Sequence, residues 1–484
     1  MNQAIRNTWI ALMVLFVAIM GSLTYVQFFT ADELNANPLN RRQLYQDFDM
    51  ARGAILVDGS PIAESVRTDQ GQFEYQRVYH DPLLYSHLTG FYSLAAGSTH
   101  LESVMDEYLA GRSDEQAFDR LLNLFTGSST EGASVELTID GALQQEIYDI
   151  LPDDVPITAV VTDVRTGDIQ AMVSKPSYDT NLLTVPSTAQ AQENLQAIEE
   201  RPGFSPYRNP AIADLVAPGS TFKILDLVAA LESGEYDVDS ELPNPPSLDL
   251  PGSSTPLRNF EEGICERRPE EASLRFIVAQ SCNTPFAQIA ATVGEDALRD
   301  VSERFGFGQP LSIPQRVEPS RFPQELDPAL LALSSIGQYD VAATALQMNM
   351  VSMGIANDGV IMKPNLIDQI IAPDLKVLED PQPEEFSTAT TPEVADQVTE
   401  LMREPLDGGT AAAARVPGLD VAAKTGTAQI GGDSDNVNSW ITGFAPADDP
   451  QYAVTIMVPN IDYETGHSLT SPNMKKILEA VFNK

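Results

Sequence analysis

The sequence predicts an α+β protein with one membrane-spanning helix, a small N-terminal module and a larger C-terminal unit. Three observations support this class: one long uncharged apolar run near the N-terminus, apolar segments that follow either the strand or the helix period, and a length of 484 residues. That length is enough for two or three domains with sizeable cores. The 43% hydrophobic and 20% charged residues are ordinary for a folded chain.

The charge balance excludes two classes of partner. The chain has 29 basic and 69 acidic residues, a formal net charge of -40 and a pI near 4.2. Nucleic acid and anionic lipid headgroups should repel such a polyanion, so we expect neither as a partner.

Residues 9–29 form an apolar run of about the length that spans a bilayer as a helix. A cleaved signal peptide is the alternative, but its shorter apolar region would end at a small-residue site, whereas this run ends Tyr-Val-Gln-Phe-Phe. We therefore favour a retained anchor. Arg6 precedes the run and Asp32 and Glu33 follow it, which predicts a cytoplasmic tail at residues 1–8 and the rest of the chain outside.

Residues 30–132 are expected to form the small N-terminal module. Apolar alternation around Ile55, followed by Asp58-Gly59, predicts a strand and a turn. Helical periodicity is present at 101–109 and 114–124, and the Gly/Ser-rich residues 127–132 indicate a boundary. The module has no obvious catalytic cluster.

Residues 133–484 are expected to form the larger unit. Predicted strands lie at 135–140, 157–164, 169–173, 440–445 and 452–458, the second and third forming a hairpin. Predicted helices lie at 141–150, 271–280, 284–293, 330–356 with a break at Gly337-Gln338, from Thr391 to before Asp407, and 471–483. Proline-rich segments at 242–257 and 309–328, and the segment 373–385, are predicted loops.

One candidate catalytic pair starts an apolar helix after a Pro-Gly turn. Ser220 and Lys223 are three residues apart, so they lie on one helix face, with the serine at the positive end of the helix dipole. That arrangement suits a nucleophile, a base and a stabilised oxyanion. Taken alone, the pattern fits equally well a surface ion pair between Lys223 and Asp226.

Two more motifs follow, and they move the interpretation toward catalysis. Ser281-Cys282-Asn283 separates two predicted helices, and Lys424-Thr425-Gly426-Thr427 lies at a predicted strand. Acyl transfer from a peptide needs an activated nucleophile, a proton donor to the leaving amine and an oxyanion hole. Burial, the helix terminus and Lys424 would all lower the pKa of Lys223 and make it a base.

The other motif residues suit the remaining parts of that chemistry. Ser281 can relay a proton to the leaving group, and Asn283 can bind an amide carbonyl of the substrate. Gly426 allows close approach to the strand, while Lys424 with the hydroxyls of Thr425 and Thr427 suits a terminal carboxylate. We therefore expect Lys223 to point toward Ser281 and away from Asp226.

A histidine-based triad is the rival serine mechanism. The four histidines, His80, His87, His100 and His467, are all distant from Ser220 in sequence, and no G-x-S-x-G motif surrounds that serine. A His-Glu-x-x-His motif and a cysteine set for metal binding are also absent, so we expect no metal and no cofactor. The two cysteines, Cys265 and Cys282, could form a disulfide outside the cell or remain free thiols.

The three motifs, in this order, are the signature set of penicillin-recognising serine enzymes. The chain resembles class B penicillin-binding proteins, in particular the PbpA type of actinobacteria. Supporting segments are Arg52-Gly53, 88–93, 97–99, 137–140, 171–174, 335–338, 346–348, 357–359 and 440–446.

The resemblance implies a peptidoglycan D,D-transpeptidase fold: an antiparallel sheet flanked by helices, plus an all-helical subdomain. Residues 133–484 would be the transpeptidase domain and 30–132 a pedestal or dimerisation-like module, too small for a glycosyltransferase. Ser220 would be acylated, Lys223 would be its general base, and the backbone N–H groups of Ser220 and Thr427 would form the oxyanion hole. A Cys265–Cys282 bridge would stiffen one wall of the cleft.

The implied partners are D-Ala-D-Ala stem peptides, an amine acceptor, β-lactams, the membrane and a cell-wall synthesis complex. A D,D-carboxypeptidase or β-lactamase of the same superfamily is the nearest alternative, although no short motif assigns a base to a deacylating water. A non-catalytic β-lactam sensor or scaffold is less favoured, because the N-terminal tail is too short for a cytoplasmic effector and all three motifs are intact.

Overall fold

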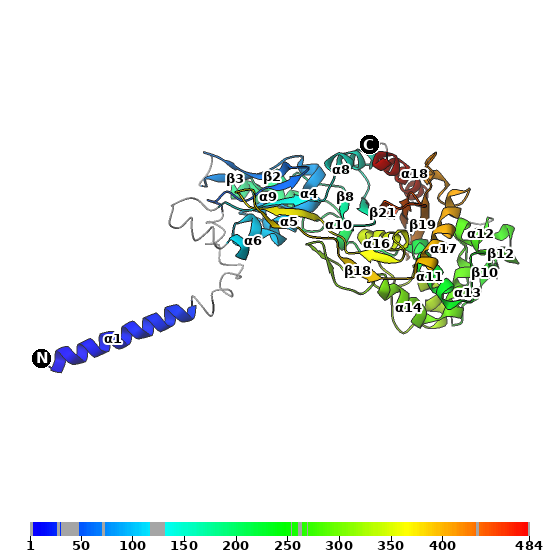
Figure 1. The fold of residues 1–484 in the computed structure, drawn as a ribbon, viewed down its shortest axis with the longest axis horizontal. Coiled ribbons are helices and arrows are strands. Elements are labelled where there is room, and N and C mark those ends of the chain that lie inside the picture. Colours follow the sequence, from blue (N-terminus) through cyan, green and yellow to red (C-terminus); the bar gives the residue numbers. More distant parts are fainter. Residues whose placement is uncertain are drawn as a thin grey trace.

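The computed structural model describes residues 3–26, 30, 48–69, 73–116, 131–252, 254–259, 264–268, 270–431 and 435–482. Helix α1 (Gln3–Thr24) stands apart from the body and is exposed to solvent (Figure 1). Its segment 5–24 forms a helix that is long enough and apolar enough to cross a membrane. This span begins before the predicted residue 9, because a helix extends through Arg6 and the polar residues beside it. Residues 27–29, 32 and 33 lie outside the described part.

A mixed sheet joins the N-terminal module to strands from much later in the chain. Its order is β17-β16-β6-β1-β2-β3. Strands β1 and β2 form a hairpin across Asp58-Gly59, which confirms the predicted strand and turn, and β6 runs parallel to β1. The strands are β1 (Ile55–Val57), β2 (Ser60–Arg67), β3 (Tyr75–Tyr79), β6 (Ser134–Leu137), β16 (Ile367–Ile371) and β17 (Val377–Glu379).

Short helices pack beside this sheet: α4 (Pro82–Thr89), α5 (His100–Val104) and α6 (Asp106–Leu109). Helical structure is therefore confirmed at 101–109, whereas most of 114–124 lies outside the described residues. The predicted loop at 373–385 is wrong in part, because it contains β17. That three-residue strand forms by pairing with β16, which local periodicity does not reveal.

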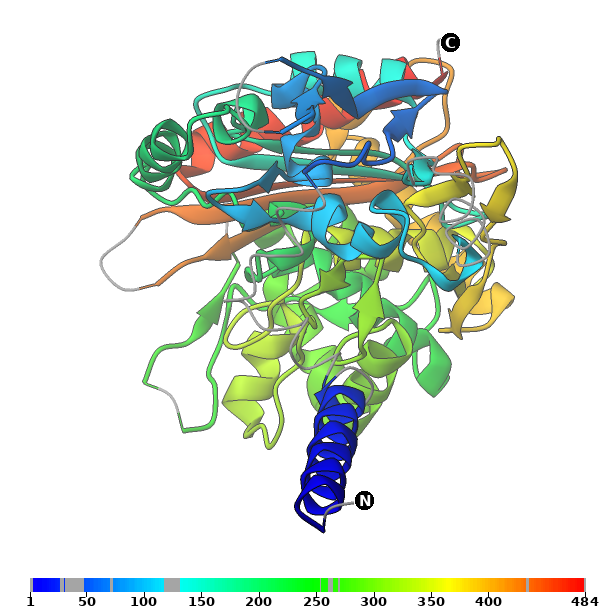
Figure 2. The same cartoon turned by 90° about the vertical axis from the view of Figure 1, so that its left-hand side faces the viewer.

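The central sheet is antiparallel throughout and has the order β19-β20-β21-β7-β8. Its strands are β7 (Ile157–Asp163), β8 (Ile169–Lys175), β19 (Ala422–Gln429), β20 (Val437–Ala445) and β21 (Tyr452–Ile461). Helices α8 (Gly141–Ile150) and α18 (Tyr463–Phe482) cover one face, and α16 (Ala345–Ala356) covers the other (Figure 2). The predicted hairpin of β7 and β8 is confirmed.

A mainly helical subdomain lies below this sheet in Figure 2. It contains α11 (Lys223–Ser233), α12 (Leu274–Gln280), α13 (Asn283–Val293), α14 (Glu295–Arg304), α15 (Pro328–Ser335) and α17 (Pro392–Arg403). Helices α9 (Thr188–Glu199) and α10 (Pro210–Ala213) precede it. The expected fold class, an antiparallel sheet flanked by helices with a helical subdomain, is confirmed.

Three local predictions are wrong in part. The predicted helix at 271–280 begins as strand β12 (Glu271–Ser273), and the closing helix starts at Tyr463 and contains Pro472. The predicted proline-rich loops contain two-residue and three-residue ladders. These are β9 (Glu241–Pro243) with β12, β10 (Ser247–Leu248) with β11 (Leu257–Arg258), and β13 (Leu311–Ser312) with β14 (Arg316–Val317). Such ladders depend on pairing across a loop.

Candidate active site

The turn that holds Ser220 is a short 3-10 helix, η4 (Gly219–Thr221), which Phe222 alone separates from α11. Gly219 has φ of 55°, and a Cβ placed on it would lie 2.6 Å from the carbonyl oxygen of Thr427. Its N–H donates to the carbonyl of Gly337 over 3.0 Å, and a Cβ on Gly337 would lie 2.1 Å from the carbonyl oxygen of Gly219. The backbone before Ser220 is thus packed between β19 and residue 337, where only glycine fits.

Two further contacts fix the same turn against the central sheet. The indole Nε1 of Trp440 donates to the carbonyl of Ala217 over 3.0 Å. A Cβ on Gly426 would lie 2.5 Å from the carbonyl oxygen of Pro218. Ser220 therefore lies beside the strand that carries Lys424 to Thr427.

Lys223 is fully buried and points at the 281–283 loop. Its Nζ donates to the carbonyl of Ser281 (2.8 Å), the carbonyl of Cys282 (3.2 Å) and Oδ1 of Asn283 (2.8 Å). It also lies 3.5 Å from Oγ of Ser281. The expected orientation of Lys223 toward Ser281 is confirmed, and the exposed ion pair with Asp226 is not formed.

Lys424 approaches the same serine from the strand. Its Nζ donates to Oγ of Ser281 over 2.7 Å and to the carbonyl of Thr425 over 3.1 Å. The Ser281 hydroxyl therefore lies between two lysine amines. Ser281 has φ of 57°, the left-handed conformation that ends α12 and turns its side chain toward both lysines.

Burial sets the electrostatics of this group. Burial and then the charge of Lys424 lower the pKa of Lys223 well below its usual value, partly opposed by Asp226. Burial lowers the pKa of Lys424 to about 7. Asp226 is fully buried, and its carboxylate oxygens accept no hydrogen bond from any described residue. Burial therefore raises the pKa of Asp226 well above its usual range.

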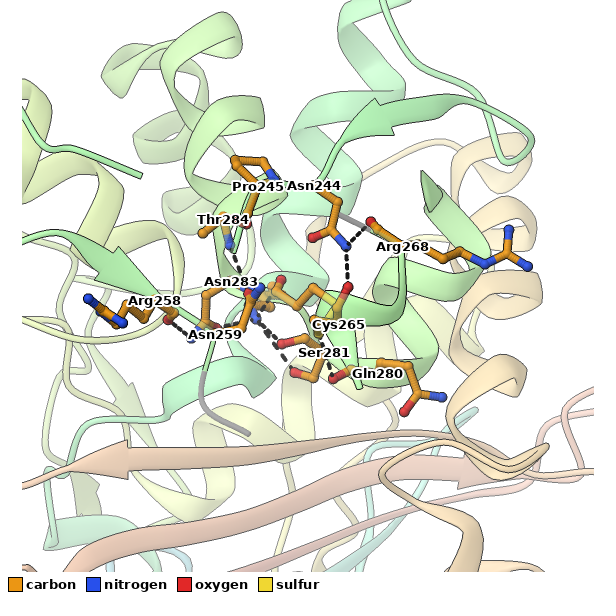
Figure 3. Close-up of a disulfide and its surroundings, with 12 residues drawn as sticks. Asn244, Pro245, Arg258, Asn259, Cys265, Arg268, Gln280, Ser281, Asn283 and Thr284 are labelled. Atoms are coloured by element: carbon orange, nitrogen blue, oxygen red, sulfur yellow. Dashed lines mark hydrogen bonds between the residues drawn. A yellow bond between two sulfur atoms is a disulfide. The ribbon is translucent and has the colours of Figure 1, made fainter. Parts of the chain in front are cut away.

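A disulfide between Cys265 and Cys282 ties the 281–283 loop to the segment before α12 (Figure 3). The Asn283 amide donates to the carbonyl of Arg258 over 3.0 Å, and its backbone N–H donates to Oδ1 of Asn259 over 2.6 Å. At the other end of the disulfide, the Asn244 amide donates to the carbonyls of Cys265 and Arg268. The 281–283 loop, which accepts the hydrogen bonds of Lys223, is thus held by the disulfide and by Asn259. Asn244 and Asn259 belong to no short motif, and the sequence analysis did not identify them.

These residues surround a cleft of about 800 Å³. Ser220, Ser281 and Asn283 line it with Thr425, Gly426 and Thr427, while Lys223 and Lys424 are fully buried behind its surface. The Oγ1 of Thr425 donates to Oγ1 of Thr410, over 2.7 Å. Among the described lining residues there is no aspartate or glutamate, although the chain has 69 of them.

The rest of the lining includes residues that no short motif marks, among them Gln338, Tyr339, Trp440 and His467. His467 lies on α18, where its ring stacks on Tyr463. No hydrogen bond joins His467 to Ser220 among the described residues. The same part of the chain contains no cluster of three metal-ligating side chains.

This fold, with two buried lysines behind a cleft that Ser220 lines, is that of a serine acyltransferase. Family models agree, because residues 157–479 match the penicillin binding protein transpeptidase domain, and residues 52–135 match the penicillin binding protein A dimerisation domain. The chain therefore belongs to the penicillin-binding proteins with a transpeptidase domain, as the sequence motifs predict.

Its relatives place it more narrowly, with the class B proteins of the PbpA type. It is 39% identical over 466 residues to peptidoglycan D,D-transpeptidase PbpA of Mycolicibacterium smegmatis, covering 95% of this chain and 94% of that protein. It is 37% identical to PbpA of Mycobacterium tuberculosis, covering 99% of each. The structure of penicillin-binding protein A from M. tuberculosis as a ceftriaxone acyl-enzyme matches with a TM-score of 0.84 and 34% identity, over 90% of this chain and 100% of that one.

Proposed function

We propose that this chain is a membrane-anchored peptidoglycan D,D-transpeptidase that works through an acyl-enzyme on Ser220. The observation that carries the proposal is the Ser281 hydroxyl, held between the amines of Lys223 and Lys424 at the edge of a cleft that Ser220 also lines. This arrangement places two buried amines and a hydroxyl relay at the cleft into which the Ser220 turn leads.

In the first step, neutral Lys223 takes the proton from Oγ of Ser220, which attacks the carbonyl carbon of the penultimate D-Ala of a stem peptide. A lysine buried this deeply, beside a second cation, is neutral far more readily than an exposed one. The oxyanion forms at the start of α11, where the N–H groups of Ser220 and Thr427 are its donors.

Collapse of the tetrahedral intermediate breaks the peptide bond. The leaving amine of the terminal D-Ala receives a proton from Oγ of Ser281, which is replenished from the lysines. Lys424 donates to that oxygen over 2.7 Å, so the relay needs no rearrangement of the loop. The amine of a neighbouring stem then attacks the ester on Ser220 by the reverse path and forms the cross-link.

The walls of the cleft suit an anionic peptide. Thr425 and Thr427 present hydroxyls on the strand, and Gly426 between them lets this strand pack closely against the Ser220 turn. The charge of Lys424 lies behind them, and the absence of acidic side chains from the described lining removes repulsion of a terminal carboxylate. Asn283 lies opposite, to bind a carbonyl of the substrate.

β-Lactams follow the same path and remain attached to Ser220. Relatives support this step, since penicillin-binding protein A of M. tuberculosis has been solved as acyl-enzymes with ceftriaxone and with penicillin G. Fluorescent penicillin should label the wild-type chain and leave Ser220→Ala unlabelled. Equal labelling of the two proteins would show that the nucleophile lies elsewhere.

A second assay separates transfer from hydrolysis. Incubation with a D-Ala-D-Ala stem-peptide donor and an amine acceptor should yield a cross-linked product as well as free D-Ala. Release of D-Ala without any cross-linked product would identify a D,D-carboxypeptidase. The proposed mechanism assigns no residue as a base that would activate a water molecule to hydrolyse the acyl-enzyme.

The placement of the protein follows from α1, which we take as a single-pass anchor with the N-terminus in the cytoplasm and the catalytic cleft outside. Residues 30–132 then act as a pedestal that also serves association within a cell-wall synthesis complex. Labelling of intact cells by a membrane-impermeant fluorescent penicillin tests the orientation. Labelling that appears only after the membrane is permeabilised would reverse it.

A further inference from the structure

A tyrosine at the mouth of the cleft has a backbone conformation that its residue type disfavours. Residues 338–341 form a turn in which the Val341 N–H donates to the carbonyl of Gln338 over 3.3 Å. Tyr339 is its second residue and has φ of 61°, a conformation that turns normally assign to glycine, asparagine or aspartate. Its side chain is 54% exposed and lines the same cleft as Ser220.

The surroundings fix this turn against the catalytic backbone. Two residues earlier, the carbonyl of Gly337 accepts the N–H of Gly219. On the other side, Arg321 and Ala342 exchange two backbone hydrogen bonds, and Arg321 pairs with Asp340 over 2.9 Å. The turn is thus held at both ends, which fixes the position of the Tyr339 backbone at the cleft. Residues in such sparsely populated backbone conformations cluster at active sites and ligand-binding positions.

The position of the turn indicates what the ring would contact. The Ser220 turn is packed between residues 426–427 of β19 on one side and Gly337 on the other. Under the proposed function, the terminal carboxylate of the donor lies on the β19 side. The acyl part, which stays on the enzyme, occupies the rest of the cleft, where Leu333 and Ile336 add apolar surface beside Tyr339.

We propose that the Tyr339 ring forms a binding surface for the apolar part of the acyl donor and so determines which acyl groups the enzyme accepts. Tyr339 takes part in no bond-making step. The proposal rests on the assignment of Ser220 as nucleophile, but it fails separately from it, because loss of the ring should change selectivity and leave acylation intact.

Two β-lactams test it directly in the full-length protein. Benzylpenicillin has a phenylacetyl group on the acyl side, whereas 6-aminopenicillanic acid has the same ring system and carboxylate without that group. Tyr339→Gly removes the ring and suits the positive φ. We expect the second-order acylation rate constant for benzylpenicillin to fall roughly three- to tenfold, as loss of an aromatic contact does. The constant for 6-aminopenicillanic acid should change less than about twofold.

Matched variants separate the ring from the backbone. Tyr339→Phe should retain the selectivity. Leu375→Gly relaxes another exposed residue with positive φ, at 69° and 83% exposed in a turn outside the cleft lining, and should alter neither rate constant. Equal losses with both β-lactams, or no loss with either, would overturn the proposal. So would unchanged acylation with a slower transfer to the amine acceptor, because the ring would then contact the acceptor.

Discussion

Two lysines define the site at the scale of single residues, and their effects on each other follow from burial. An ammonium group without water around it costs free energy, which is why both amines have lowered pKa values and hydrogen-bond acceptors around them. Lys223 meets three oxygens of the 281–283 loop, and Lys424 meets the Ser281 hydroxyl. Asp226 is buried one turn from Lys223, where burial favours its neutral form.

Substitution of Lys424 should change the pH dependence of acylation. Lys223 accepts a proton only when neutral, and the positive charge of Lys424 lowers the pKa of Lys223. Lys424→Met retains the length and removes the charge, so the pKa of Lys223 should rise. The acid limb of the pH profile for penicillin acylation should therefore move to higher pH. Lys363→Met, at an exposed lysine paired with Glu384, is the control. A limb that stays in place or moves to lower pH would contradict this electrostatic account.

At the scale of elements, the loop between α12 and α13 is the part that must keep its shape. Its backbone supplies two of the acceptors of Lys223, and its ends are a left-handed serine and an asparagine that begins α13. Neither helix alone determines the path of this triplet. The Cys265–Cys282 disulfide and the Asn259 side chain hold it from outside the two helices, and Asn244 holds the Cys265 end of the disulfide.

Reduction of the disulfide should destabilise the protein and slow its acylation. The bridged cysteines are 17 residues apart, and closing a loop of that size contributes about 3 kcal/mol to stability. A thermal melt with and without reductant should show a lower Tm in the reduced sample, with a smaller rate constant for penicillin. The double variant Cys265→Ser/Cys282→Ser should start at the lower Tm and not respond to reductant. If reductant leaves the Tm of the wild-type protein unchanged, the disulfide does not stabilise it.

At the scale of the whole molecule, the N-terminal module and the transpeptidase domain share a sheet and a core. Ile55 of β1 pairs with Val135 of β6, and β6 pairs in turn with β16 from the C-terminal half. Apolar residues of the module and of α11 belong to one continuous core cluster. The module, pedestal though it is, is therefore also a structural part of the catalytic unit.

Truncations should reveal this dependence. Removal of residues 1–47 takes away the exposed α1 and should leave the Tm and the penicillin labelling of a detergent-free preparation intact. Removal of residues 1–132 takes away β1 to β3, exposing the edge of β6 and its apolar face, and should give an aggregating or unlabelled product. A 133–484 fragment that is monomeric and labels at the wild-type rate would show that the catalytic domain folds alone.

Much of this architecture could be predicted where local sequence decides structure. The β7–β8 hairpin, the turn at Asp58-Gly59 and the helix that Thr391 caps follow from turn residues, apolar periodicity and capping, which act over a few residues. The short strands β12 and β17 could not be predicted in the same way. Each has only three residues, too few to show a period, and each is a strand because it pairs: β12 with the remote β9, and β17 with the neighbouring β16.

The same division applies to the site. Chemical types and local spacing could be read from the amino-acid order: Ser220 and Lys223 on one helix face, and a lysine with hydroxyls on a strand. Three features depend on long-range packing: Lys424 reaches Ser281, 143 residues away, Asp226 is buried, and Tyr339 has positive φ at the cleft. The reason is physical: covalent geometry and helix periodicity fix neighbours within a turn, whereas contacts between distant segments depend on how sheets and helices pack.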